Sequence, residues 1–283
     1  MDTQTSAKLA EMSYDLGRAS KKDIPDTIDT INEHLQDENI NYEVVPEWSD
    51  RQVITYRNLD DPNKIHISHK GTQVGSSTQN RDLLADLKIA FGFSPHDRYV
   101  KKRKKRTERI IDNLNPDELT MSSHSLGGMT QNYTVAKSKK VRDVLLQGDT
   151  FNAGSSPLFN NDLKIGKKTK TQLNKIPLRH HRTKRDIVSA GLVDNLPFGE
   201  LVEYKTRANN HEKEHKKIDE GFYEKQNIKT KKELQKMGYL ERGVYDHHIH
   251  HFSDRIIDPI QKHKNTKNKK LNKKNMFSFI PFL

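Results

Sequence analysis

A serine set among small residues at positions 120–129 is the stretch whose residue types best suit covalent chemistry. The sequence there is TMSSHSLGGM, in which Ser123 and Ser125 are followed by Gly127 and Gly128. Two adjacent glycines at a helix start cost backbone entropy, so ordinary packing does not account for them. A sharp strand-to-helix turn that exposes one side chain does account for them, because small flanking residues relieve the crowding. The stretch therefore predicts a nucleophile elbow with Ser125 at its tip.

A serine in such an elbow is suited to acyl transfer. The helix that we expect from about Leu126 would point its first backbone N–H groups at the charge that develops on a substrate oxygen. We therefore predict the Leu126 amide as an oxyanion donor. Ser123 stands where such elbows usually carry glycine, so a glycine-rich turn without catalysis is the alternative that this stretch leaves open.

Hydrophobic spacing and turn residues predict the elements that must hold the elbow. Helices are expected within residues 1–40, at 81–93, at 98–114 and from about 126. Strands are expected at 42–45, 52–56, 65–69 and 119–121, within 141–157 where a strand ends in a Gly/Ser turn, and at 176–188. Because strands and helices alternate, we expect an α/β fold with a mostly parallel sheet flanked by helices.

Six stretches, taken in chain order, resemble the class 3 lipase family over roughly residues 50–252. They are IHISHKGT, RDLLADL, SHSLGG, DTFNAGSSP, RDIVSAGLVDNLP and DHHIHHF. The resemblance implies an α/β-hydrolase domain at 41–258. An N-terminal helical extension at 1–40 would precede it, and a basic tail with a short apolar end at 259–283 would follow.

The same resemblance implies the members of a catalytic triad. Ser125 would be the nucleophile, Asp186 the acid and His247 the base, in the chain order that α/β hydrolases follow. Asp194 is the nearest alternative acid. Three more histidines crowd the segment of the base and remain alternatives to it, namely His248, His250 and His251.

A second oxyanion donor is implied at the end of the strand in IHISHKGT. Thr72 follows Gly71 there, and Lys70 replaces the arginine that is usual in the family. Its backbone N–H and hydroxyl would act together with the Leu126 amide.

Composition limits the other kinds of site. The 283 residues include no cysteine, which excludes disulfides and thiolate metal sites, and the formal net charge is +12. The N-terminus lacks an apolar signal core and no run reaches the roughly 18–20 apolar residues of a membrane span. We therefore expect a cytoplasmic, released or virion-associated protein, and the Lys/Asn-rich, cysteine-free composition fits a viral origin.

A basic run at 101–106, KKRKKR, is expected on a solvated helix face, where it could hold the protein at an anionic membrane. Nucleic acid is a less favoured partner because no aromatic residues are interleaved with the run. The predicted contact residues are Lys101, Lys102, Arg103, Lys104, Lys105 and Arg106. Neither HEKEH at 211–215 nor the histidines of DHHIHHF predicts a functional metal site.

The sequence thus predicts a carboxylic ester hydrolase that acts on a lipid, either triacylglycerol or phospholipid, without a metal or cofactor. The positive charge slightly favours phospholipid. Two alternatives stay open: a catalytically inactive hydrolase fold used for binding or structure, and a basic protein that binds nucleic acid.

Overall fold

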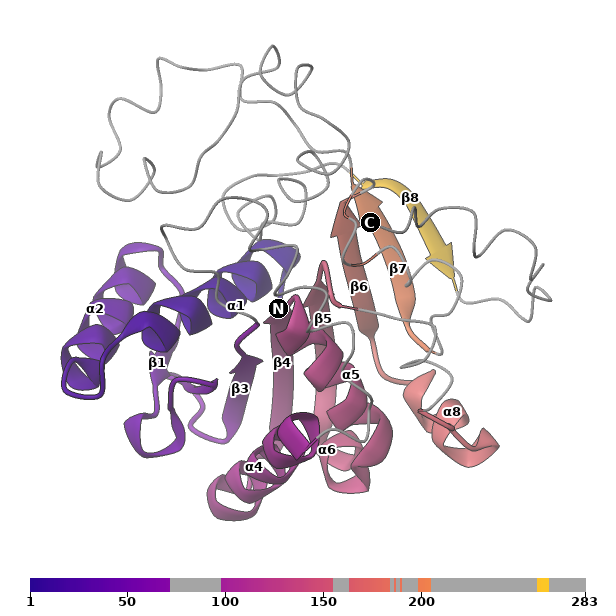
Figure 1. Cartoon of the computed structure of the whole chain (residues 1–283), viewed down its shortest axis with the longest axis horizontal. Coiled ribbons are helices and arrows are strands. Elements are labelled where there is room, and N and C mark those ends of the chain that lie inside the picture. Colours follow the sequence, from indigo (N-terminus) through magenta and orange to yellow (C-terminus); the bar gives the residue numbers. More distant parts are fainter. Residues whose placement is uncertain are drawn as a thin grey trace, which may run out of the picture.

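The computed structural model describes residues 1–71, 98–154, 163–183, 186, 189 and 198–204, together with the backbone of 259–264. Within these residues eight strands form one sheet whose order in space follows the order in the chain (Figure 1). The strands are β1 (Tyr42–Val44), β2 (Val53–Asn58), β3 (Lys64–His69), β4 (Glu118–His124), β5 (Leu145–Phe151), β6 (Leu178–Thr183), β7 (Glu200–Tyr204) and β8 (Pro259–Lys264).

Strands β3 to β7 run parallel, whereas β1 and β2 at one edge and β8 at the other are antiparallel to their neighbours. The described helices are α1 (Thr3–Arg18), α2 (Ile24–Asp37), α4 (Arg98–Leu114), α5 (Leu126–Lys137), α6 (Lys139–Val144) and α8 (Lys167–Leu173), with a 3-10 turn η1 (Pro46–Trp48). A parallel pair needs a crossover, which α4 supplies between β3 and β4, and α5 with α6 between β4 and β5. This is the α/β-hydrolase fold, and the predicted fold class is confirmed.

Alternation along the strands divides the side chains between two faces of the sheet. On one face the main core packs α4 and α5 against apolar strand residues such as Ile67 and Met121. On the other face α1 and α2 pack on Ile54 and Tyr56, and α1 also covers Phe151. The segment that we expected to be an N-terminal helical extension thus lies against the sheet that carries the elbow.

Several element boundaries can be compared with the expectations from sequence. The helices at 98–114 and from 126 are confirmed, and so are the strands at the centre of the sheet. The strand expected from 141 begins only at Leu145, because the Ser138 hydroxyl accepts a hydrogen bond from the Val141 N–H at 3.3 Å and starts α6. Residues 259–264, expected in the basic tail, form β8, since an edge strand tolerates lysines. The helix expected at 81–93 lies outside the described residues.

Candidate active site

Ser125 occupies a strained turn between β4 and α5. Its φ of 55° and ψ of -127° lie where residues other than glycine are uncommon. Two main-chain hydrogen bonds fix the turn to the end of β5. The Ser125 N–H donates to the Phe151 carbonyl at 3.1 Å, and its carbonyl accepts from the Gly154 N–H at 2.9 Å. The surrounding structure therefore holds this serine in a conformation that it would not adopt by itself.

The two glycines after Ser125 are needed for close packing of the elbow. A Cβ atom added at Gly127 would lie 2.8 Å from the His69 carbonyl carbon and closer still to its oxygen. A Cβ at Gly128 would lie 2.6 Å from the Cβ of Ala153. Because real Cβ atoms do not approach so closely, both positions require glycine if α5 is to start beside the ends of β3 and β5.

Ser123, which stands where glycine is usual, has a hydrogen-bonding role in the strand. Its buried hydroxyl accepts from the His69 N–H at 3.1 Å and donates to the Ser122 carbonyl at 2.6 Å. The hydroxyl thus satisfies the backbone N–H of His69, which ends β3 and is the residue in register with Ser123.

The end of β3 approaches the elbow at Gly71. A Cβ atom added to Gly71 would lie 2.8 Å from the His124 carbonyl oxygen and 3.1 Å from the Cβ of Ser125. Leu126 begins α5, so its N–H is among the helix donors that have no partner within the helix. The other predicted oxyanion residue, Thr72, lies outside the described residues.

Asp186 is buried just beyond β6. Its N–H donates to the Thr183 carbonyl at 3.1 Å, and its Oδ2 accepts from the N–H of Ser189 at 2.9 Å and from the Ser189 hydroxyl. Parallel strands end at one edge, and β5 alone separates β4 from β6, so their ends are about 10 Å apart. His247, the three alternative histidines and Asp194 lie outside the described residues.

The basic run of α4 is less uniform than we expected. Lys101, Lys102 and Lys105 are exposed. Arg103 is instead 2% exposed: its guanidinium donates to the Lys70 carbonyl and lies 4.2 Å from the centre of the Tyr99 ring. The expectation that Arg103 faces solvent is therefore wrong, because its position in the helix turns it toward the sheet.

The other two cations of the run are partly exposed and have partners within the fold. Lys104 pairs with Glu108 at 2.7 Å. Arg106 lies 3.7 Å from Asp50 and 5.0 Å from the centre of the Trp48 ring.

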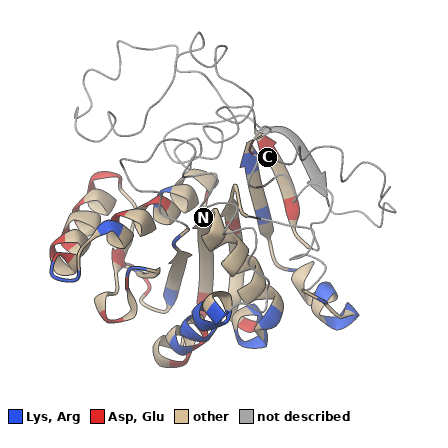
Figure 2. Cartoon of the chain, in the orientation of Figure 1, with Lys and Arg blue, Asp and Glu red and all other residues tan. Residues whose placement is uncertain are grey.

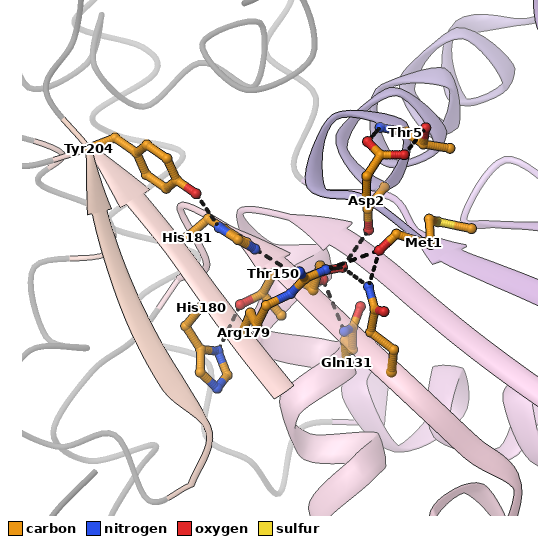
Figure 3. A network of polar contacts seen from close by, with 12 residues as sticks. Met1, Asp2, Thr5, Gln131, Thr150, Arg179, His180, His181 and Tyr204 are labelled. Atoms are coloured by element: carbon orange, nitrogen blue, oxygen red, sulfur yellow. Dashed lines mark hydrogen bonds and ion pairs between the residues drawn. The ribbon is translucent and has the colours of Figure 1, made fainter. Parts of the chain in front are cut away.

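A buried polar network beneath α1 was not expected from the sequence (Figure 3). The Asp149 carboxylate accepts from Arg179 at 2.6 and 2.8 Å, from His181 Nε2 at 3.0 Å and from the Ser6 hydroxyl at 2.8 Å. His181 Nδ1 in turn lies 2.9 Å from the Tyr204 hydroxyl. Although burial opposes ionisation, hydrogen bonds and charges of His181 and Arg179 hold the pKa of Asp149 well below its usual range. The available signal was Asp149 itself, the one charged residue of β5.

Neither a metal-binding cluster nor a membrane-spanning helix is found in the described part of the chain. It contains no group of three or more His, Asp or Glu residues that could hold a metal ion. Among the same residues, no helix combines the length and apolar character needed to cross a bilayer. HEKEH and DHHIHHF lie outside these residues.

Comparison with known proteins gives similar folds but no sequence match. No protein-family model matches the chain, and neither does any curated protein sequence. Lipase II from Rhizopus niveus is similar over 70% of this chain and 78% of its own, with a TM-score of 0.45 and 13% identity. Lip2 lipase from Yarrowia lipolytica is similar over 72% and 77%, with a TM-score of 0.42 and 15% identity. A triacylglycerol lipase whose catalytic centre is a serine protease triad is similar over 72% of this chain and 79% of its own, with a TM-score of 0.42 and 15% identity.

Proposed function

We propose that this protein is a serine hydrolase of the class 3 lipase type that cleaves carboxyl esters of lipids. The observation that carries the proposal is the conformation of Ser125, a positive-φ serine between a parallel strand and a helix. Backbone strain of this kind costs about 1–3 kcal/mol and persists where the surrounding structure fixes it, commonly at active sites. The two glycines packed against β3 and β5 are the supporting features.

In the proposed reaction, Ser125 Oγ attacks the ester carbonyl carbon while His247 accepts its proton. The carbonyl oxygen becomes an oxyanion, which the Leu126 N–H and Thr72 stabilise. The bond to the alcohol oxygen then breaks, and His247 returns the proton to that oxygen. Water repeats the sequence on the acyl-enzyme and releases the fatty acid. Asp186 orients the imidazole and stabilises its charged form.

For the substrate we propose a phospholipid at an anionic membrane, with triacylglycerol as the alternative. Arg103 reaches the Lys70 carbonyl at the end of β3, so the first turns of α4 lie at the edge of the sheet that carries Ser125. Three exposed lysines of those turns, Lys101, Lys102 and Lys105, would meet a surface that presents substrate to that edge. Positive charge recurs on α4, α6 and α8 (Figure 2).

The proposal is tested by measuring hydrolysis of a soluble short-chain ester, a triacylglycerol emulsion and anionic phospholipid vesicles. We expect activity in the wild type, with the vesicles preferred over the emulsion. Ser125→Ala, Asp186→Asn and one of four single alanine variants at residues 247, 248, 250 and 251 should each be inactive. A wild type without activity on any ester, together with tight RNA or DNA binding, would contradict the proposal.

A further inference from the structure

The peptide bond between Lys70 and Gly71 is held at both of its polar groups. On the carbonyl side the Arg103 guanidinium donates a hydrogen bond to the Lys70 oxygen. Arg103 is almost fully buried and its guanidinium lies over the Tyr99 ring. Burial of a guanidinium is costly unless the charge gains specific partners. Its presence here, in a run whose exposed members are lysines, indicates a task at the end of β3.

On the N–H side the partner is Tyr14 of α1. The Gly71 backbone N–H donates to the Tyr14 hydroxyl, which also lies 2.7 Å from Nδ1 of His124. Burial raises the pKa of Tyr14 well above its usual range, so the hydroxyl keeps its proton at neutral pH. A protonated hydroxyl can donate once and accept twice, so it can accept from Gly71 while donating to His124.

The two side chains come from helices on opposite faces of the sheet. α4 packs in the core formed with β3 and β4, whereas α1 covers the other face, beside Phe151. The Lys70–Gly71 peptide is therefore fixed from both sides, and rotation about its flanking bonds would break a hydrogen bond to one helix or the other. A Cβ added at Gly71 would lie 3.1 Å from the Ser125 Cβ, so this peptide borders the nucleophile.

We propose that Arg103 and Tyr14 are positioning residues that hold the Lys70–Gly71 peptide in place beside Ser125. They would thereby fix the backbone from which Thr72, the proposed oxyanion donor, follows. This inference rests on the proposed function, because it assigns a task within that reaction. Displacement of a reacting group by about 1 Å can cost about 10²-fold in rate. Loss of either contact is thus expected to lower kcat while leaving KM nearly unchanged, because the oxyanion forms in the transition state.

The test compares two variants with two matched controls on a soluble short-chain ester. Tyr14→Phe removes the hydroxyl and keeps the ring. Its control is Tyr56→Phe, which also removes one hydroxyl bond between the sheet and α1, namely the bond to the Leu9 carbonyl at 2.9 Å. Arg103→Met removes the guanidinium, and its control is Arg109→Met, which removes an exposed cation from the same helix. Arg103→Lys restores a donor and should recover part of the rate.

We expect kcat to fall about 10–10²-fold in Tyr14→Phe and in Arg103→Met, with KM within about 2-fold and fluorophosphonate labelling slowed to the same degree. The double variant should lose less than the product of the two single losses, because both act on one peptide. Both controls should retain the wild-type kcat.

Wild-type kcat in both test variants would overturn the inference, and so would equal losses in the controls, which would indicate a structural role. Failure of the proposed function gives a different result: the wild type itself would show no hydrolysis above Ser125→Ala.

Discussion

A Cβ atom added at Gly127 would lie 2.8 Å from the backbone carbonyl carbon of His69 and closer still to its oxygen. Backbone atoms of a central strand cannot move aside as a flexible side chain can. We therefore expect Gly127→Ala to lower the free energy of unfolding by about 1–3 kcal/mol and to abolish esterase activity by shifting Ser125. Gly166→Ala is the control, because a Cβ there would meet no heavy atom within 4 Å apart from those of its own residue and its chain neighbours. Wild-type activity in Gly127→Ala would mean that the elbow tolerates a side chain.

The network around Asp149 should contribute strongly to stability. Asp149→Asn leaves Arg179 and His181 facing a neutral amide, which should lower the unfolding free energy by about 3 kcal/mol in urea titrations. We take the lower end of the range for a broken buried pair because the Arg179 side chain is 27% exposed. Asp112→Asn breaks an exposed pair with Lys140 and should cost less than about 1 kcal/mol. Equal effects of the two changes would contradict the account of this network.

Stability should fall in mild acid because three buried histidines favour the neutral form. Burial lowers the pKa of His66 and His69 to about 3 and that of His180 to about 4. In the unfolded chain these histidines have a pKa of about 6.5. Between about pH 6 and pH 4 they are therefore protonated in the unfolded chain but stay neutral in the folded protein, which favours unfolding. Each histidine then contributes a slope of about 1.4 kcal/mol per pH unit. Unfolding free energies that stay level from pH 7 to pH 5 would contradict this assignment.

The sequence could predict those features that depend on patterns within a short stretch of the chain. Strands β1 to β6 and the helices at 98–114 and from about 126 follow from local hydrophobic spacing, and the elbow follows from two glycines after a serine. Strands β7 and β8 were not predicted, because they lie in the highly charged part of the chain. Arg103 was misassigned because six consecutive cations suggest a solvated face, whereas helical geometry turns one of them toward the core.

Contacts between distant segments could not be predicted in this way. Tyr14 and His124 are 110 residues apart, and no local pattern links them. Likewise Ser6 meets Asp149 only because α1 lies across the sheet. The direction in which a helix crosses a sheet depends on the packing of the whole chain. The hydrophobic periodicity of the helix alone does not predict it.

The exposed lysines at the start of α4 should strengthen binding to anionic vesicles. Each contributes about 1 kcal/mol near such a surface, so changing Lys101, Lys102 and Lys105 to Gln should weaken vesicle binding by about 10²-fold in sedimentation assays. The same change at Lys167, Lys168 and Lys170 of α8, which lies beside the start of β6, removes equal charge and should have a smaller effect (Figure 1).

Salt gives a second measure of the same contact. Hydrolysis of anionic vesicles should fall steeply as ionic strength rises, because the Debye length is only about 8–10 Å in ordinary salt. If the α4 and α8 lysine variants bind vesicles equally, the net charge of the whole molecule determines binding. The proposal that α4 contacts the membrane would then be contradicted.

The most direct test of the central claim is to locate the covalent adduct of a fluorophosphonate probe by peptide mass spectrometry. An activated serine attacks the phosphorus and displaces fluoride, whereas an ordinary serine hydroxyl does not react. We predict one adduct on the wild type, on the peptide that contains Ser125, and none on Ser125→Ala. An unlabelled wild type, or labelling that persists in Ser125→Ala, would contradict the assignment of Ser125 as the nucleophile.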